Sequence, residues 1–155
     1  MENLVARASV LVAAPRRAVW DALLAPETIT KIMPVEEVVA AWRVGRPFVW
    51  RFAVAGWRTR VEGFVHRVED ERLLEYAFVD PHSRDVLHVD NVHRVTIELG
   101  DDAGGTRVAV VQDANVSKTA RAHAEGGWRL ALNNLKGLVE EAHRRRPAHG
   151  EVEGA

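Results

Sequence analysis

The strongest constraint on the fold is an apolar stripe close to the C-terminal end of the chain. Between residues 118 and 143, apolar side chains recur at three- and four-residue intervals, at Trp128, Leu132, Leu135, Val139 and Ala142. This period predicts one long amphipathic helix with a single buried face. Such a helix needs an apolar surface to pack on, and the preceding part of the chain is expected to supply it.

Most of the region between residues 36 and 112 alternates apolar and polar side chains, as strands with one buried face do. Pro15 and Pro26 favour two short helices, at residues 15–24 and 26–32, because proline suits the first turn of a helix. The expected strands are residues 5–13, 38–42, 48–54, 57–68, 72–79, 86–99 and 106–112. Gly63 lies within a strand and indicates a bulge or a close backbone approach. The pattern predicts an α+β fold: a curled antiparallel sheet around the final helix.

Length and charge narrow the class of protein. The 155 residues suffice for one domain, which we place at residues 1–143, and residues 144–155 are expected to form a disordered tail. The 21 basic and 22 acidic side chains leave a net charge of −1, so a nucleic-acid partner is not expected. The chain has no cysteine, which excludes disulfides and thiolate-bound metals.

No apolar run reaches the roughly 18 residues of a membrane span, so we expect no membrane insertion and a cytoplasmic location. The N-terminal residues alternate and lack a basic start, which favours a strand over a signal peptide. His82, Asp85, His88 and Asp90 are potential metal ligands, but their spacing matches no ligand motif. We therefore expect no metal and no cofactor.

The order of these elements, together with an ordered set of residues, resembles a known superfamily. The residues that carry the resemblance are Ala14, Pro15, Val19, Trp20, Asp21, Ala22, Leu23, Pro26, Glu27, Val44, Gly45, Gly63, Phe64, Val65, Arg72, Leu73, Leu74, Gly105, Thr106, Arg107, Val108, Gly127, Trp128, Leu132 and Leu135. They resemble the START-like or SRPBCC superfamily, and within it the family related to the C-terminal domain of the heat-shock protein 90 ATPase activator. The resemblance implies a helix-grip fold, in which six to seven antiparallel strands curl around a long C-terminal helix.

Aromatic side chains on the inner face of the expected sheet are the first candidates for a site. The expected cavity-lining residues are Trp50, Phe52, Tyr76, Phe78, Trp128 and, on the helix, Leu132. One interpretation is simple core packing between sheet and helix. The other is an apolar pocket, because aromatic walls with a few polar groups are typical of small-molecule sites. The sequence leaves both open.

Asn91, His93 and Gln112 are polar residues on the same inner face. An unpartnered buried polar group costs about 1–3 kcal/mol, so each is expected to bind a neighbour, a water molecule or a ligand. Alternatively, the face opens to solvent at these strand ends. His93 is also a candidate general acid or base, because imidazole titrates near neutral pH.

From the residues and the resemblance we expect a non-catalytic binder of a small apolar or amphipathic molecule. A polyketide cyclase or aromatase-like enzyme is the first alternative, since some members of the superfamily act on such substrates. A chaperone-associated interaction module is the second. We expect a chaperone partner less than a small ligand, because 155 residues leave no space for the extra N-terminal domain of the eukaryotic activator. Homodimerisation through exposed strands stays open.

Overall fold

The computed structural model describes residues 4–33, 35–54, 57–79, 92–115 and 117–145. The elements, in chain order, are β1 (Leu4–Val12), α1 (Arg16–Leu24), α2 (Pro26–Ile32), β2 (Val35–Ala40), β3 (Pro47–Val54), β4 (Trp57–Glu69), β5 (Leu73–Val79), β6 (Val92–Asp102), β7 (Gly105–Asn115) and α3 (Lys118–Arg145). The predicted order of one strand, two short helices, six strands and a long helix is confirmed. Asn91 and the histidine- and aspartate-bearing segment before it lie outside the described residues.

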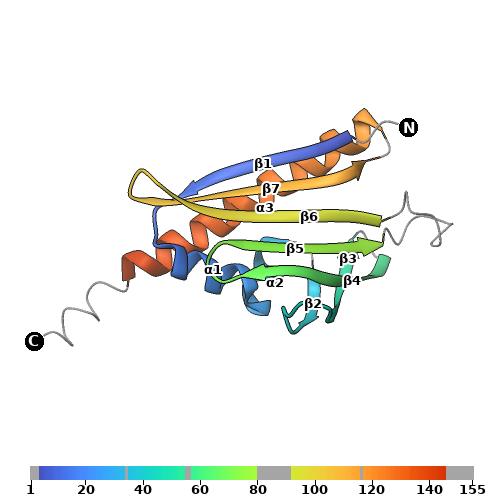
Figure 1. The fold of residues 1–155 in the computed structure, drawn as a ribbon, viewed down its shortest axis with the longest axis horizontal. Helices are drawn as coiled ribbons and strands as arrows, with labels where there is room; N and C mark the ends of the chain where they lie inside the picture. Colours follow the sequence, from blue (N-terminus) through green and yellow to red (C-terminus); the bar gives the residue numbers. More distant parts are fainter. Residues whose placement is uncertain (1–3, 34, 55–56, 80–91, 116, 146–155) are drawn as a thin grey trace, which may run out of the picture.

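The strands form one antiparallel sheet in the order β1-β7-β6-β5-β4-β3-β2, with β1 and β2 at its two edges (Figure 1). The helices α1 and α2 connect these two edges, and α2 packs against β2. The second strand ends at Ala40, two residues earlier than predicted. The reason lies at Trp42, whose φ of 50° is incompatible with an extended strand.

Helix α3 runs along one face of the sheet, packs against β1 and β7, and meets α1 and α2 near its C-terminal end (Figure 1). Its buried residues include Leu132, Leu135 and Val139, which confirms most of the predicted stripe. Ala142 is exposed, so its prediction as a buried residue is wrong: the helix there faces an open groove beside α1 and α2. The helix also continues to Arg145, two residues into the predicted tail.

Side chains of α3, among them Glu125, Lys136 and Glu140, bind backbone groups along the free edge of β1 and just after it. The Glu140 carboxylate accepts a hydrogen bond from the backbone N–H of Ala13 at 2.8 Å. Lys136 donates to the backbone carbonyl of Leu11, also at 2.8 Å, and to Glu140 at 2.6 Å. Unpaired edge groups invite pairing with other chains. These hydrogen bonds therefore both cover the edge of β1 and attach α3 to the sheet.

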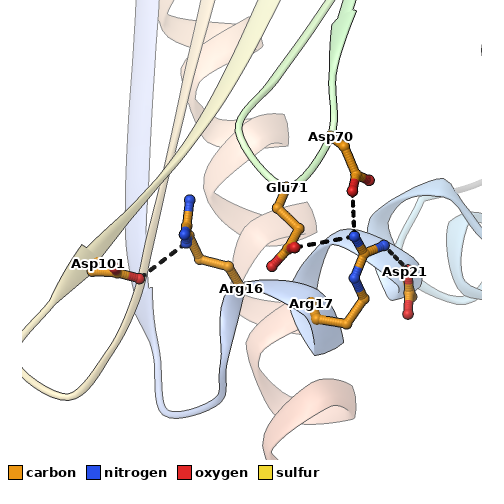
Figure 2. Close-up of polar contacts among 6 residues, drawn as sticks. All are labelled: Arg16, Arg17, Asp21, Asp70, Glu71 and Asp101. Atoms are coloured by element: carbon orange, nitrogen blue, oxygen red, sulfur yellow. Dashed lines mark hydrogen bonds and ion pairs between the residues drawn. The ribbon is translucent and has the colours of Figure 1, made fainter.

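Ion pairs fix α1 to the turns at one end of the sheet (Figure 2). The pairs are Arg17 with Asp21, Asp70 and Glu71, and Arg16 with Asp101. The hydrogen bond that Arg17 donates to Asp70, followed by the one that it donates to Asp21, raises the pKa of its guanidinium above the usual value. The Arg17 side chain is 49% exposed, so the cluster orients α1 and contributes little to stability.

The core lies between the sheet and the helices, and Gly63 is closely packed against its neighbours. A Cβ built on Gly63 would lie 2.1 Å from the carbonyl oxygen of Ala77 and 2.5 Å from Cζ of Phe48. The predicted close backbone approach is therefore found here. The register of β4 against β5 shifts between Val65 and Arg67, so the strand irregularity lies beyond the glycine.

Candidate functional site

Four aromatic rings from β3 and β5 meet on the inner face of the sheet. We call Phe48, Trp50, Tyr76 and Phe78 the aromatic wall. The ring centroids are 5.2 Å apart for Phe48 and Tyr76, 5.5 Å for Phe48 and Trp50, 5.7 Å for Trp50 and Tyr76, and 6.4 Å for Tyr76 and Phe78. Alternation along each strand places these side chains on one face. The wall thus forms a continuous aromatic surface across three strands.

The strand between β3 and β5 explains how rings from non-adjacent strands touch. On β4, Gly63 pairs with Phe48 on one side and Phe78 on the other, and Val61 pairs with Trp50. Glycine and valine are small, so the larger rings on both sides lean over β4 and meet above it. The sequence pattern of large residues on β3 and β5 with small ones on β4 therefore produces the wall.

Trp42 belongs to the same cluster and was missed as a site residue. Its ring lies 6.1 Å from that of Phe48 and 6.4 Å from that of Tyr76. Its indole N–H donates to the backbone carbonyl of Leu24 at the end of α1, at 2.9 Å. The neighbouring turn, where Gly45 has a φ of 80°, was the available signal that the chain bends back here.

His93 extends the wall onto β6. Its ring stacks on Phe78 with a centroid distance of 5.2 Å, and only 9% of the residue is exposed. Nδ1 lies 3.1 Å from the backbone carbonyl oxygen of Asp113. A carbonyl oxygen only accepts, so Nδ1 carries a proton in this contact and Nε2 of the neutral ring is an acceptor.

Tyr76 is one of the two most deeply buried members of the wall, at 1% exposed. Burial raises the pKa of its hydroxyl well above the ordinary value of 10.0, and no hydrogen bond contributes to the shift. Among the residues that the structure describes, none pairs with this hydroxyl. Tyr76 therefore remains a protonated donor within an apolar surrounding.

Gln112 and Trp128 form a polar contact between β7 and α3. The indole N–H of Trp128 donates to Oε1 of Gln112 at 2.8 Å, and both residues are half-buried. The expectation that Gln112 binds a neighbour is met by a residue that was itself a site candidate. The bond fixes the N-terminal half of α3 beside the sheet.

The structure thus brings together Trp50, Tyr76, Phe78 and His93, and it pairs Gln112 with Trp128. Leu132 is buried in the core on α3. The side chain of Phe52 and all of Asn91 lie outside the described part of the chain, so their assignment to the site stays a prediction.

A groove that the sequence did not predict lies between α1, α2 and the C-terminal end of α3. It is an open groove of about 560 Å³. Ala22 and Leu138 supply apolar surface, while Lys31, Glu141 and Arg145 supply charges of both signs. Glu141 and Arg145 are ion-paired at 2.8 Å. The groove therefore carries charges of both signs, and part of them are neutralised by this ion pair.

Neither a metal-binding cluster nor a membrane-spanning helix occurs in the described part of the chain. Within these ranges, no group of three or more histidine, aspartate or glutamate side chains is arranged to hold a metal ion. Among the described helices, none is both long enough and apolar enough to cross a membrane.

A curled antiparallel sheet with a long C-terminal helix and two short helices after the first strand defines the helix-grip, or START-like, class of α+β proteins. A more particular assignment follows from sequence. The family model described as "Activator of Hsp90 ATPase homolog 1-like protein" matches residues 13–140. The chain belongs to this family. No curated protein matches the chain significantly.

Solved structures support the same fold. A protein from Cytophaga hutchinsonii, with 28% identity, has a TM-score of 0.77 over 93% of this chain and 99% of its own. The AHSA1-like protein from Aeromonas hydrophila, with 23% identity, has a TM-score of 0.73 over 90% of this chain and 94% of its own. A protein from Chromobacterium violaceum, with 22% identity, has a TM-score of 0.74 over 88% and 97%.

Proposed function

We propose that the protein binds a small apolar or amphipathic molecule between the sheet and α3, without catalysing a reaction. The observation that carries the proposal is the aromatic wall, which continues through Phe78 to His93 at the start of β6. Rings offer a large apolar contact area, and a few polar groups orient a ligand within it.

The exposure of the wall suggests where a ligand approaches. Phe48 and Tyr76 are each 1% exposed, whereas Phe78 is half-buried. Trp128 and Gln112 are also half-buried, so the accessible rings and the polar contacts gather toward the same side of the core. A ligand entering there would meet Phe78 first and then the deeper rings.

Two Phe residues on the sheet provide a matched test. Phe78 belongs to the aromatic wall. Phe64 is 57% exposed and pairs across the strands with Ala77, the residue before Phe78 on β5. Phe78→Trp would fill space at the accessible end of the wall, and Phe64→Trp would not. Titration with the uncharged dye Nile red should give several-fold weaker binding for Phe78→Trp only. Equal binding by both variants and the original protein would place the dye elsewhere and contradict the proposal.

Native mass spectrometry of the purified protein complements the titration, because it detects a co-purified molecule and the assembly state together. The family description favours one other function, stimulation of the ATPase of an Hsp90 chaperone. An ATPase assay with the Hsp90 of the same organism tests it: a rise in turnover would support this second function, and an unchanged rate would dispose of it.

A further inference from the structure

From β3 to Leu99 of β6, the inner face of the described sheet has no formally charged side chain. Its members are Phe48, Trp50, Val61, Gly63, Val65, Leu74, Tyr76, Phe78, His93, Val95, Ile97 and Leu99. The next position on this face of β6 is Asp101, which pairs with Arg16 at the end of the sheet. An anionic or cationic ligand placed on this face would lose its hydration without gaining a counter-ion, which is costly. The composition of the face therefore selects an uncharged ligand.

Two polar groups on this face, Nε2 of His93 and the hydroxyl of Tyr76, are available to hydrogen-bond a ligand. His93 uses Nδ1 for the carbonyl of Asp113, and among the described residues nothing pairs with Nε2. The hydroxyl of Tyr76 also has no partner within the described ranges. His93 Nε2 accepts a hydrogen bond and the Tyr76 hydroxyl donates one.

These two groups lie close together along the sheet. Tyr76 pairs with Val95 across β5 and β6, and His93 is two residues from Val95 on the same face. The ring of Phe78 links them, at 6.4 Å from Tyr76 and 5.2 Å from His93. A flat ligand beside Phe78 would therefore lie next to the two side chains that carry this donor and this acceptor.

We infer that the ligand is an uncharged aromatic molecule with a hydroxyl group, oriented by the Tyr76 hydroxyl and by Nε2 of His93. This inference rests on the proposed function. A hydroxyl group both donates and accepts, so it matches either partner. An aliphatic chain would use the rings but neither polar group, and a carboxylate would compete poorly because the face supplies no cation.

Three probes of one shape separate these possibilities: naphthalene, 2-naphthol and 2-naphthoate. Isothermal titration at neutral pH should give an affinity for 2-naphthol about tenfold above that for naphthalene, the effect of one or two neutral hydrogen bonds. We expect 2-naphthoate to bind most weakly. Equal affinities for naphthalene and 2-naphthol, or a preference for 2-naphthoate, would overturn the inference and leave the proposed function intact. If no probe binds the folded protein, the proposed function itself fails.

Substitutions then assign the preference to residues. Tyr76→Phe removes only the hydroxyl, and His93→Asn retains an amide donor for Asp113 while it removes Nε2. Each should reduce the ratio of 2-naphthol to naphthalene affinity several-fold. His66→Asn, at an exposed histidine of β4, is the matched control and should leave the ratio unchanged. An unaltered ratio in both Tyr76→Phe and His93→Asn would overturn the inference.

The groove beside α1 and α2 is the alternative binding site for the probes. Ala142→Arg would obstruct it without touching the aromatic wall, because Ala142 is exposed and lines the groove. We expect this variant to bind 2-naphthol as the original protein does. Loss of binding in Ala142→Arg, with full binding in Tyr76→Phe, would place the probe in the groove and overturn the inference.

Discussion

The ring of Phe48 occupies the space that a side chain at Gly63 would need. A Cβ at Gly63 would lie 2.5 Å from Cζ of Phe48, far inside normal contact, and 2.1 Å from the carbonyl oxygen of Ala77. This overlap is the reason that Phe48 reaches Tyr76, with ring centroids 5.2 Å apart, although β4 separates their strands. The aromatic wall thus depends on one missing side chain.

Gly63→Ala is therefore expected to destabilise the protein by about 1–3 kcal/mol or more, because overpacking here meets backbone as well as a ring. Urea unfolding followed by tryptophan fluorescence measures the loss. Gly137→Ala in α3 is the matched control: its Cβ meets nothing within 4 Å. Removing a glycine from a helix should stabilise by about 1 kcal/mol. Equal midpoints for the two variants would contradict the packing described at Gly63.

The sequence predicted this architecture well because periodicity reports which face of each element is buried. The strand that carries Phe78 and the helix that carries Leu135 were both found in this way. At Gly63 the pattern allowed either a bulge or a close approach. The choice depends on where the Phe48 ring lies across the strand pair, which is a tertiary contact that no local pattern contains.

Other features were missed because they join residues far apart in the chain. Lys136 and Glu140 have the spacing of a solvated helical pair, yet both bind the backbone of β1. Trp42 looked like the end of a strand, but its positive φ turns it onto Phe48. The groove that Ala142 lines comes from three helices, so it had no signal in any one of them.

Trp128 and Gln112 should contribute to stability as a coupled pair. Their hydrogen bond of 2.8 Å joins α3 to β7, and both residues are half-buried. Trp128→Phe and Gln112→Met each remove it. A double-mutant cycle from urea unfolding should give a coupling energy of about 1 kcal/mol, the usual net worth of a neutral hydrogen bond. Strictly additive losses would indicate that the bond contributes nothing in solution.

Glu140 should make stability depend on pH in the acid range. The hydrogen bond from Lys136, with that from the Ala13 backbone, lowers the pKa of Glu140 below its usual 4.5. Because the folded-state pKa is depressed, this contribution is complete above pH 4.5 and is lost as the pH falls through the folded-state pKa. Glu140→Gln should therefore lose less stability than the original protein over this acid range.

The control for this pH effect is Glu141→Gln, one residue along α3. Glu141 pairs with Arg145 on the surface and its side chain is 56% exposed. Its removal should leave the acid slope of the unfolding free energy close to that of the original protein. If Glu140→Gln shows the same slope as Glu141→Gln, the carboxylate of Glu140 does not bind the edge of β1 as described.

The Tyr76 hydroxyl should be dispensable in the unliganded protein. The Tyr76 residue is 1% exposed, and no hydrogen bond from a described residue to its hydroxyl contributes to stability. After removal of any bound molecule by unfolding and refolding, Tyr76→Phe should be as stable as the original protein or up to about 1 kcal/mol more stable. Tyr76→Leu, which deletes the ring, should lose about 2–4 kcal/mol instead. A clear loss of stability in Tyr76→Phe would mean that the hydroxyl has a protein partner.

Tyr76 is the single tyrosine of the chain, so its ionisation can be followed directly by ultraviolet absorbance of the phenolate. Burial raises its folded-state pKa above the ordinary 10.0, so the phenol should stay protonated in the folded protein as the pH passes 10.0. A raised folded-state pKa means that this contribution to stability is complete below pH 10.0 and declines above it. Phenolate should therefore appear only together with unfolding, detected in parallel by circular dichroism. Reversible ionisation of the folded protein near pH 10.0 would instead mean that Tyr76 is open to solvent.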